Sequence, residues 1–235
     1  MLLPTPLLDG LLMERENRFR ARVRLNGSEV LAHVPNPGRT VELLYSGARV
    51  LLTPRPEPGR RTAYDLILAY TVDDILVSLD TRFPSRLFGE AMAAGRLSPL
   101  ADYRVARAEI PFGASRLDFA LTPHDGAASP LPPCLVEVKS STYVMDGLGL
   151  WPDAPSLRGQ RHVRELADAV AQGYRAAIVW FVQRPDARCL TPNRAVDGGF
   201  GAALDAARAA GVEAYAYTCR VTRGSIEVAD LIPVI

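Results

Sequence analysis

The only lysine of the chain is the first residue whose type points to chemistry. Of the 27 basic residues, 26 are arginines and one, Lys139, is a lysine. A solvated surface tolerates either cation, so a compositional bias can replace lysine by arginine there. A site that needs a compact ammonium able to lose its proton does not accept a guanidinium, which stays charged and is wide and planar. Lys139 is therefore a candidate catalytic residue, and a lysine retained by chance is the alternative.

A carboxylate lies close to this lysine. Residues 134–139 have the apolar pattern of a short strand, in which Glu137 and Lys139 point to the same face about 6.8 Å apart. A carboxylate and an ammonium at this spacing can share a ligand or a metal-bound water. Glu-x-Lys is also a common tripeptide, so a solvated strand face is the alternative interpretation.

Two further carboxylates lie on the strands that precede this segment. Asp118 belongs to a predicted strand over residues 116–121, where it can lie beside Glu137, and Glu109 belongs to one over residues 103–110. Converging carboxylates repel one another unless a cation lies between them, and hard divalent ions such as Mg²⁺ or Mn²⁺ prefer oxygen ligands. Such an ion activates water and neutralises charge on a phosphate, and a neighbouring lysine can orient that water or accept its proton. These residues predict metal-dependent hydrolysis of a phosphodiester.

The first 80 residues predict a small β-barrel. Residues 18–24 alternate with a period of two, which places Phe19, Ala21 and Val23 on the inner face of a strand. Asn26-Gly27 favours a tight turn after this strand. Further strands are predicted over residues 29–33, 47–53, 63–71 and 75–79. Short strands separated by turns over this length are typical of an OB-like barrel.

From residue 81 onward the pattern alternates between helix and strand. Residues 158–172 predict the clearest helix, because Val163, Leu166 and Val170 repeat at the spacing of one buried face and Gly173 follows as a C-terminal cap. The other predicted elements are helices over residues 84–97 and 200–210 and strands over 103–110, 116–121, 134–139, 176–182 and 212–218. This alternation predicts an α/β domain with a mixed sheet. We therefore expect two domains, residues 1–80 and residues 81–235.

Four arginines of the predicted barrel suggest contact with nucleic acid. Arg18, Arg20, Arg22 and Arg24 share the outer face of one predicted strand. Their spacing of about 6.8 Å suits contacts with successive phosphates of a DNA backbone. The alternative is a strand edge that charge keeps soluble.

The segment His33-Val-Pro-Asn-Pro-Gly-Arg39 predicts a rigid turn with exposed polar tips. In the functional interpretation, His33, Asn36 and Arg39 touch either the DNA backbone or the second domain. In the alternative, the turn is structural and the Asn36 side chain holds backbone amides.

The helix over residues 158–172 adds polar side chains that can reach a phosphate. These are Arg158, Gln160, Arg161 and His162. Arg158 and His162 are four residues apart and share a helix face, which we expect to lie opposite the apolar face. A solvated face with an Arg161–Glu165 ion pair is the alternative, and we assign His162 no catalytic role.

Composition excludes several classes of protein. Hydrophobic residues make up 48% of the 235 residues and charged residues 23%, which is typical of a folded globular chain. The formal net charge of +1 gives no bulk attraction to DNA, so any basic footprint is local. No apolar run approaches the roughly 20 residues that cross a bilayer, and the first residues lack a secretory signal. Three scattered cysteines fit neither a disulfide scaffold nor a zinc site, so we expect a reduced, cytoplasmic protein without a membrane partner.

The order of these features resembles two known groups of proteins. A strand with Asp118, a loop, a strand with Glu137 and Lys139, and an amphipathic helix resemble the core of the PD-(D/E)XK nuclease superfamily. Over nearly its full length the chain also resembles the sugar fermentation stimulation protein family. The matching stretches are HVPNPGR (33–39), SRLDF (115–119), CLVEVKS (134–140), WPDA (151–154) and RGQRHVREL (158–166).

The resemblance implies an α/β fold class, or α+β when the chain is taken as a whole. An N-terminal OB-like β-barrel is followed by a PD-(D/E)XK nuclease-like mixed α/β sheet domain. It also implies DNA binding and a role in the regulation of sugar utilisation genes. Carried over residue by residue, the superfamily pattern makes Asp118 and Glu137 metal ligands and Lys139 the catalytic lysine beside them. Glu109 matches an additional acid of some members, and Leu117 departs from the proline that precedes the aspartate.

Three functions remain open at this point. The first is a protein that binds single- or double-stranded DNA and whose Asp118, Glu137 and Lys139 form a Mg²⁺- or Mn²⁺-dependent phosphodiester-cleaving centre. The second is a non-catalytic, DNA-binding transcriptional regulator that keeps the nuclease fold as a platform. The third is a small-molecule phosphohydrolase, which the missing glycine-rich phosphate loop disfavours. The sequence leaves open the choice of metal, the DNA sequence preference and a homo-oligomeric state.

Overall fold

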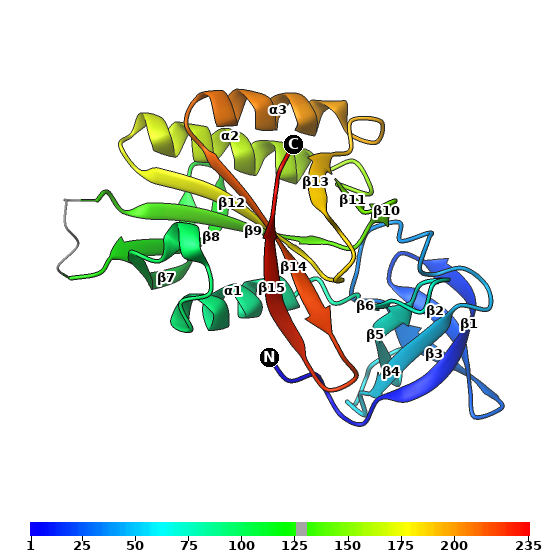
Figure 1. Cartoon of the computed structure of the whole chain (residues 1–235). Coiled ribbons are helices and arrows are strands. Elements are labelled where there is room, and N and C mark those ends of the chain that lie inside the picture. Colours follow the sequence, from blue (N-terminus) through cyan, green and yellow to red (C-terminus); the bar gives the residue numbers. More distant parts are fainter. Residues whose placement is uncertain (126–130) are drawn as a thin grey trace.

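The computed structural model describes residues 1–125 and 131–235 (Figure 1). Its N-terminal strands are β1 (Leu8–Asn17), β2 (Arg20–Leu25), β3 (Ser28–His33), β4 (Arg49–Pro54), β5 (Tyr64–Tyr70) and β6 (Leu76–Ser78). They run in the order β3-β2-β1-β4-β5-β6, and an additional pairing of β3 with β5 closes the first five into a barrel. Ala21, Val23 and Leu25 alternate into its buried core, as the period of two requires. The predicted OB-like barrel is confirmed.

The strand predicted to start at Arg18 begins at Arg20 instead. The expectation that Phe19 faces the core is wrong, because its side chain is 51% exposed in the turn between β1 and β2. The backbone N–H of Phe19 donates to Asn17 Oδ1 at 2.9 Å, and the ring stacks on His33. An asparagine that closes its own turn in this way ends the strand locally. Arg18 therefore lies in the turn and does not belong to β2.

The remaining chain forms a mixed six-stranded sheet with three long helices. The elements are α1 (Phe83–Ala93), the short 3₁₀ helix Ser98–Leu100, β7 (Tyr103–Phe112), β8 (Ser115–Pro123), β9 (Cys134–Ser141), α2 (Leu157–Ala171), β12 (Arg175–Val182), α3 (Gly198–Ala209), β14 (Glu213–Val221) and β15 (Ile226–Ile232). The strand order is β15-β14-β12-β9-β8-β7. β9, β12 and β14 run parallel to one another, whereas β7, β8 and β15 pair antiparallel. The predicted mixed sheet is confirmed.

A small second sheet lies where the residue pattern predicted no strands. It consists of β10 (Val144–Met145), β11 (Leu148–Trp151) and β13 (Cys189–Pro192), in the order β10-β11-β13. β11 and β13 pair in parallel. The indole N–H of Trp151 at the end of β11 donates to the carbonyl of Ser140 at 2.9 Å, so the small sheet is tied to the end of β9.

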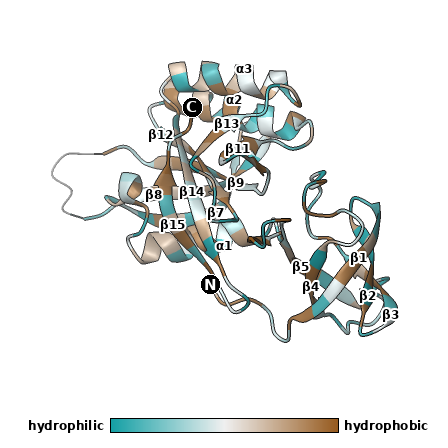
Figure 2. Cartoon of the chain, turned by 45° about the vertical axis from the view of Figure 1, so that its right-hand side comes forward, coloured by the Kyte–Doolittle hydropathy of each residue, from teal (hydrophilic) through white to brown (hydrophobic). Residues whose placement is uncertain are grey.

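Helices cover both faces of the large sheet. Figure 1 shows α2 and α3 on one face and α1 on the other. The two faces have separate cores, and the strands between them are largely hydrophobic (Figure 2). Ser156 caps the N-terminus of α2, because its Oγ accepts from the backbone N–H of Gly159 at 3.0 Å. The buried residues of α2 include Val163 and Leu166, as predicted. None of the helices in the described ranges is both long and apolar enough to span a bilayer.

The barrel docks on the carboxyl end of β9, beside the predicted chemical residues. Gln183 follows β12 and has no exposed surface. Its side chain accepts from Ser78 Oγ at 2.9 Å and donates to Ser140 Oγ at 2.8 Å. One buried amide therefore links β6, the strand that extends the barrel sheet beyond β5, to the residue that follows Lys139, and this link fixes the barrel relative to the site.

The segment His33–Arg39 forms part of this junction. Asn36 is buried, and its Oδ1 accepts from the backbone N–H of Gly38 at 2.9 Å. A Cβ on Gly38 would lie 2.3 Å from an Asp153 carboxylate oxygen, so a larger residue here would displace the Asp153 side chain. Asp153 in turn accepts from the backbone N–H of Thr40 at 3.2 Å. The segment is thus a structural turn that touches the second part of the chain.

Candidate active site

β8 and β9 bring Asp118 and Glu137 together where their ladder ends. The antiparallel pairing stops at Phe119 and Val136, one residue short of these two acids. In place of a further backbone pairing, a carboxylate oxygen of Asp118 accepts from the backbone N–H of Val138 at 2.7 Å. This side-chain hydrogen bond holds Asp118 against β9.

Glu137 is the centre of a buried polar cluster. Its Oε1 accepts from Lys139 Nζ, two residues along the same face of β9, and from Nδ1 of His162 on α2. The side chain of Glu137 is 3% exposed, that of His162 is 1% exposed and that of Lys139 is 12% exposed. Lys139 Nζ also lies 5.9 Å from the centre of the Trp151 ring, within reach of a cation–π interaction.

The two acids differ in how readily they carry charge. Burial raises the pKa of Asp118 to about 6, and the neighbouring Glu137 carboxylate adds to the increase. Burial opposes ionisation of Glu137 as well, but the hydrogen bond from His162 and the charge of Lys139 outweigh it and hold its pKa below the ordinary value. The surroundings therefore favour the charged form of Glu137 and disfavour the charged form of Asp118.

This corner of the protein suits a hard cation, although it is not a ready-made metal cage. Over residues 1–125 and 131–235, no three His, Cys, Asp or Glu side chains gather as a metal-ligand cluster. Glu137 Oε2, however, is buried and has no hydrogen-bond partner among the residues that the structure describes. A buried anionic oxygen without a partner destabilises the folded state, and a second carboxylate beside it adds electrostatic repulsion. A divalent cation between Asp118 and Glu137 would remove both costs.

Glu109 lies near the two acids but is engaged elsewhere. The register of β7 and β8 places Glu109 between pairs that flank Asp118, and its charge contributes to the raised pKa of Asp118. Its backbone has φ 55°, which is uncommon for a residue with a side chain. The exposed carboxylate of Glu109 pairs with Arg116 at 3.3 Å. In this conformation Glu109 does not complete a metal shell with Asp118 and Glu137.

The polar residues of α2 are not all available to a phosphate. Arg158 and Arg161 are exposed, and Arg161 Nε donates to Ser115 Oγ at 2.8 Å. Gln160 donates instead to Asp197 at 2.9 Å, at the start of α3. The expectation that His162 lies opposite the apolar face is wrong, because it is buried against Glu137.

The Arg161–Glu165 ion pair of the alternative interpretation is absent among the described residues, and Glu165 is buried. Its carboxylate accepts from the backbone N–H of Ala114 at 3.0 Å, so α2 clamps the β7–β8 turn. A pattern of apolar residues cannot reveal such positions, because a polar side chain is buried only where another element supplies its partner.

Two of the barrel arginines are neutralised by an acid on the neighbouring strand. Glu16 of β1 pairs with Arg20 at 2.5 Å and with Arg22 at 2.6 Å. Arg24 is exposed, and over residues 1–125 and 131–235 it forms no ion pair. Arg39 is exposed as well. The strip of four free cations expected on one strand is therefore reduced.

Arg15 is a structural residue that no motif or residue pattern of the sequence singles out. Its guanidinium donates to the carbonyls of Arg18 at 2.9 Å, Asn36 at 3.0 Å and Gly38 at 2.7 Å. It also donates to Thr40 Oγ1 at 2.8 Å. One arginine thus holds the β1–β2 turn and the His33–Arg39 segment together, and His33 Nδ1 lies 3.0 Å from the carbonyl of Phe19 in the same turn.

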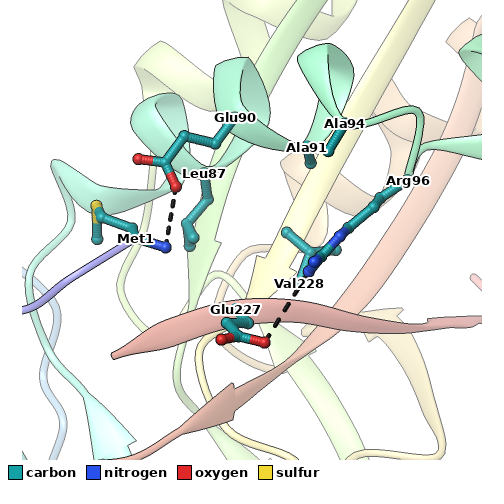
Figure 3. Close-up of a pocket in the computed structure, with 8 residues that line it drawn as sticks. All are labelled: Met1, Leu87, Glu90, Ala91, Ala94, Arg96, Glu227 and Val228. Atoms are coloured by element: carbon teal, nitrogen blue, oxygen red, sulfur yellow. Dashed lines mark ion pairs between the residues drawn. The ribbon is translucent and has the colours of Figure 1, made fainter. Parts of the chain in front are cut away.

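A cavity of about 170 Å³ lies on the opposite face of the sheet, between α1 and β15 (Figure 3). Its charged groups are already paired: Glu90 with the amino group of Met1 at 2.9 Å, and Arg96 with Glu227 at 4.0 Å. None of the predicted site residues lines this cavity. The cluster around Glu137 therefore remains the better candidate for chemistry.

Comparisons with known proteins match the chain over nearly all of its length. Residues 13–79 match the family model described as the SfsA N-terminal OB domain, and residues 82–225 match the sugar fermentation stimulation protein RE domain. A sugar fermentation stimulation protein homolog of Moorella thermoacetica is 46% identical over 220 residues, which cover 93% of this chain and 92% of the relative. A homolog of Caldanaerobacter subterraneus is 39% identical and covers both chains completely.

A solved structure agrees with the sequence relatives. Pyrococcus furiosus SfsA, determined in complex with Ca²⁺, superposes with a TM-score of 0.88 at 29% identity and covers 100% of this chain and 98% of its own. The expected architecture, an OB-like barrel followed by a mixed α/β sheet domain, is confirmed. The chain therefore belongs to the sugar fermentation stimulation protein family, as its sequence motifs predicted.

Proposed function

We propose that this protein binds DNA and cleaves its phosphodiester bonds at Asp118, Glu137 and Lys139, with Mg²⁺ or Mn²⁺ held by the two acids. One observation carries the proposal: a buried carboxylate oxygen without a partner lies in a two-acid corner beside the only lysine of the chain. The Pyrococcus furiosus relative in complex with Ca²⁺ supports a hard divalent cation in this family.

The proposed roles follow from the contacts of each side chain. A bound divalent ion supplies charge neutralisation at the phosphate and a more acidic water. The Val138 N–H holds Asp118 in place, and the Lys139 ammonium keeps Glu137 ionised. When a substrate phosphate displaces Lys139 Nζ from Glu137, the ammonium can orient the attacking water or stabilise developing negative charge. Arg158 and Arg161 supply exposed cations for the flanking phosphates.

A non-catalytic regulator is the second candidate, and a specific contact favours it. Lys139 is only 12% exposed and is paired with Glu137. An ammonium that never leaves such a pair acts as a structural cation, and the nuclease-like sheet then serves only as a binding platform. The name of the family supports a link to sugar utilisation genes for either candidate.

We also propose that residues 1–80 and 81–235 are separate domains that act together on DNA in the cytoplasm. The three cysteines are free thiols, which suits a reducing compartment. Formation of a homo-oligomer stays a prediction.

Purified protein is expected to cleave DNA in the presence of Mg²⁺ or Mn²⁺. The Glu137→Gln variant is expected to cleave at least about 100-fold more slowly, a factor typical of lost electrostatic stabilisation. Both single- and double-stranded substrates are incubated with each metal and with chelator. Asp168→Asn, an acid-to-amide change on the exposed side of α2, is the matched control and keeps the wild-type rate. DNA binding without metal-dependent cleavage by the wild type would favour the regulator instead.

DNA affinity is expected to depend more on Arg24 than on Arg22. Arg24 is exposed without an ion pair in the described ranges, whereas Glu16 already neutralises Arg22. Arg24→Ala should weaken binding and reduce the slope of log Kd against log salt by roughly 1, as expected for one lost phosphate contact. Fluorescence anisotropy at several salt concentrations measures both. Equal affinity and slope for wild type, Arg24→Ala and Arg22→Ala would remove the barrel from the DNA interface.

A further inference from the structure

Arg158, His162 and Glu137 form a chain of side chains that runs from the exposed surface of α2 into the buried corner. Arg158 Nε lies 3.1 Å from Nε2 of His162, one helical turn further along α2. The other ring nitrogen of His162, Nδ1, contacts Glu137 Oε1. His162 is 1% exposed, so both of its ring nitrogens are committed to protein partners.

The direction of these hydrogen bonds follows from what each group can donate. A guanidinium Nε–H is a donor only, so His162 Nε2 must accept and carries no proton. In the neutral ring the proton then lies on Nδ1, where it is donated to Glu137 Oε1. Lys139 Nζ, 3.4 Å from the same Nδ1, cannot use it as an acceptor and donates to Glu137 Oε1 as well. Arg158 therefore fixes which tautomer His162 adopts.

The same contacts determine which oxygen of Glu137 is free. Oε1 receives both donors, from Lys139 and from His162. Oε2 is buried and receives no donor from the described part of the chain. A carboxylate held by two donors on one oxygen cannot rotate freely, so its second oxygen keeps a fixed direction.

We propose that His162, with its tautomer set by Arg158, is the positioning residue that orients Glu137 so that Oε2 faces the divalent cation. The inference rests on the proposed function, because orienting Oε2 matters only if Glu137 holds an ion. It replaces the phosphate contact first expected of His162. Neither ring nitrogen is free to act on a substrate, so His162 is not a catalytic residue. Partners that orient metal ligands in this way commonly change metal affinity or activity about 10- to 100-fold when removed.

The tautomer is tested by ¹⁵N NMR of the histidine side chains. The chain has three histidines, and the His162→Asn variant identifies the signal of His162. The His162 ring in the wild type is expected to carry its proton on Nδ1 only, because Nε2 accepts from Arg158. Arg158→Met removes the donor to Nε2 and is expected to give a mixture of tautomers. A wild-type ring protonated on Nε2 would overturn the inference.

The orientation of Glu137 is tested by calorimetric titration with Ca²⁺ in the absence of DNA, so that lost phosphate contacts do not enter. His162→Leu, which has no donor, is expected to bind Ca²⁺ at least 10-fold more weakly than the wild type. His162→Asn, whose amide N–H can replace Nδ1–H, is expected to restore most of the affinity. Arg164→Met, on the exposed side of α2, is the control and binds as the wild type does.

Two failures are distinguishable in this titration. Wild-type affinity in His162→Leu, together with lost binding in Glu137→Gln, overturns the positioning role and leaves the proposed metal site standing. Weak extracellular Ca²⁺ sites have a Kd of about 10⁻⁴–10⁻³ M. If the wild type binds no Ca²⁺ even at about 100 times this Kd, both the metal site and the inference are overturned. Thermal unfolding of each variant shows that the comparison is made on folded protein.

Discussion

Replacing Lys139 with alanine is expected to slow metal-dependent DNA cleavage about 1,000-fold, within the 10²- to 10⁴-fold range typical of a lost acid–base or electrostatic group. Lys139 supplies the only ammonium side chain of the protein, and its charge also keeps the pKa of Glu137 low. Its loss therefore removes a cation from the reacting phosphate and weakens the charge on a proposed metal ligand. Initial rates with saturating Mg²⁺ measure the effect.

Lys139→Arg separates these two contributions. A guanidinium keeps a positive charge beside Glu137 but cannot give up a proton, and it is wide and planar where the ammonium of Lys139 is compact. We expect Lys139→Arg to stay at least 10-fold below the wild type even though the ion pair is retained, a factor that corresponds to about 1.4 kcal/mol in the barrier. DNA affinity should change little in either variant, because Lys139 is nearly buried. Cleavage by Lys139→Ala at the wild-type rate would assign Lys139 to the structure alone.

The local geometry of the proposed site was predictable because it depends on short-range rules. A strand of period two places Glu137 and Lys139 on one face whatever the rest of the chain does. The turn residues between Glu109 and Asp118 make their strands neighbours, and the structure has that hairpin. The buried face of α2 likewise follows from the spacing of Val163 and Leu166.

What the sequence did not reveal depends on contacts between distant segments. Glu16 neutralises Arg20 and Arg22 only because β1 pairs with β2, and no separate strand was predicted over residues 8–17. His162 is polar and was assigned to the exposed face, yet Glu137 supplies the partner that permits its burial. Such pairs change the function assigned to a residue without changing the fold.

The contact between distant segments that brings Glu137 beside Asp118 also makes the stability of the protein depend on the charge of Asp118. Replacing Asp118 with asparagine is expected to stabilise the metal-free protein at neutral pH, which is the reverse of the usual effect of removing a buried hydrogen-bonded acid. The amide oxygen of asparagine can still accept from the Val138 N–H, so the contact at 2.7 Å has a replacement. What disappears is a carboxylate whose charge is disfavoured by burial and by Glu137.

The raised pKa of Asp118 determines both the direction of this stability change and the pH range in which it occurs. An acid that binds its proton more tightly in the folded state is stabilising while protonated, and this advantage is lost as the pH rises from the ordinary value of 3.8 through the folded value of about 6. Above about pH 7 the full cost remains, at most about 3 kcal/mol at 1.36 kcal/mol per pKa unit. Asp118→Asn should therefore exceed the wild type in unfolding free energy above pH 7 and match it near pH 4.

A divalent cation should reverse this ranking, and that reversal connects the electrostatics to the proposed function. Binding to the folded state stabilises the wild type by RT ln(1 + [M]/Kd), about 2.7 kcal/mol at 100 times Kd, whereas Asp118→Asn has lost one ligand and should gain much less. Urea unfolding of both proteins is measured at pH 7.5, about one unit above the ordinary pKa of histidine. The measurement is made first with chelator and then with Mg²⁺, and it gives the stability of each protein without and with the ion. If Asp118→Asn were less stable than the wild type with chelator present, the Val138 hydrogen bond would outweigh the charge. Equal stabilisation of both proteins by Mg²⁺ would show that the ion binds elsewhere. A cation between Asp118 and Glu137 must offset the unfavourable charge of Asp118, and Asp118→Asn no longer has that charge.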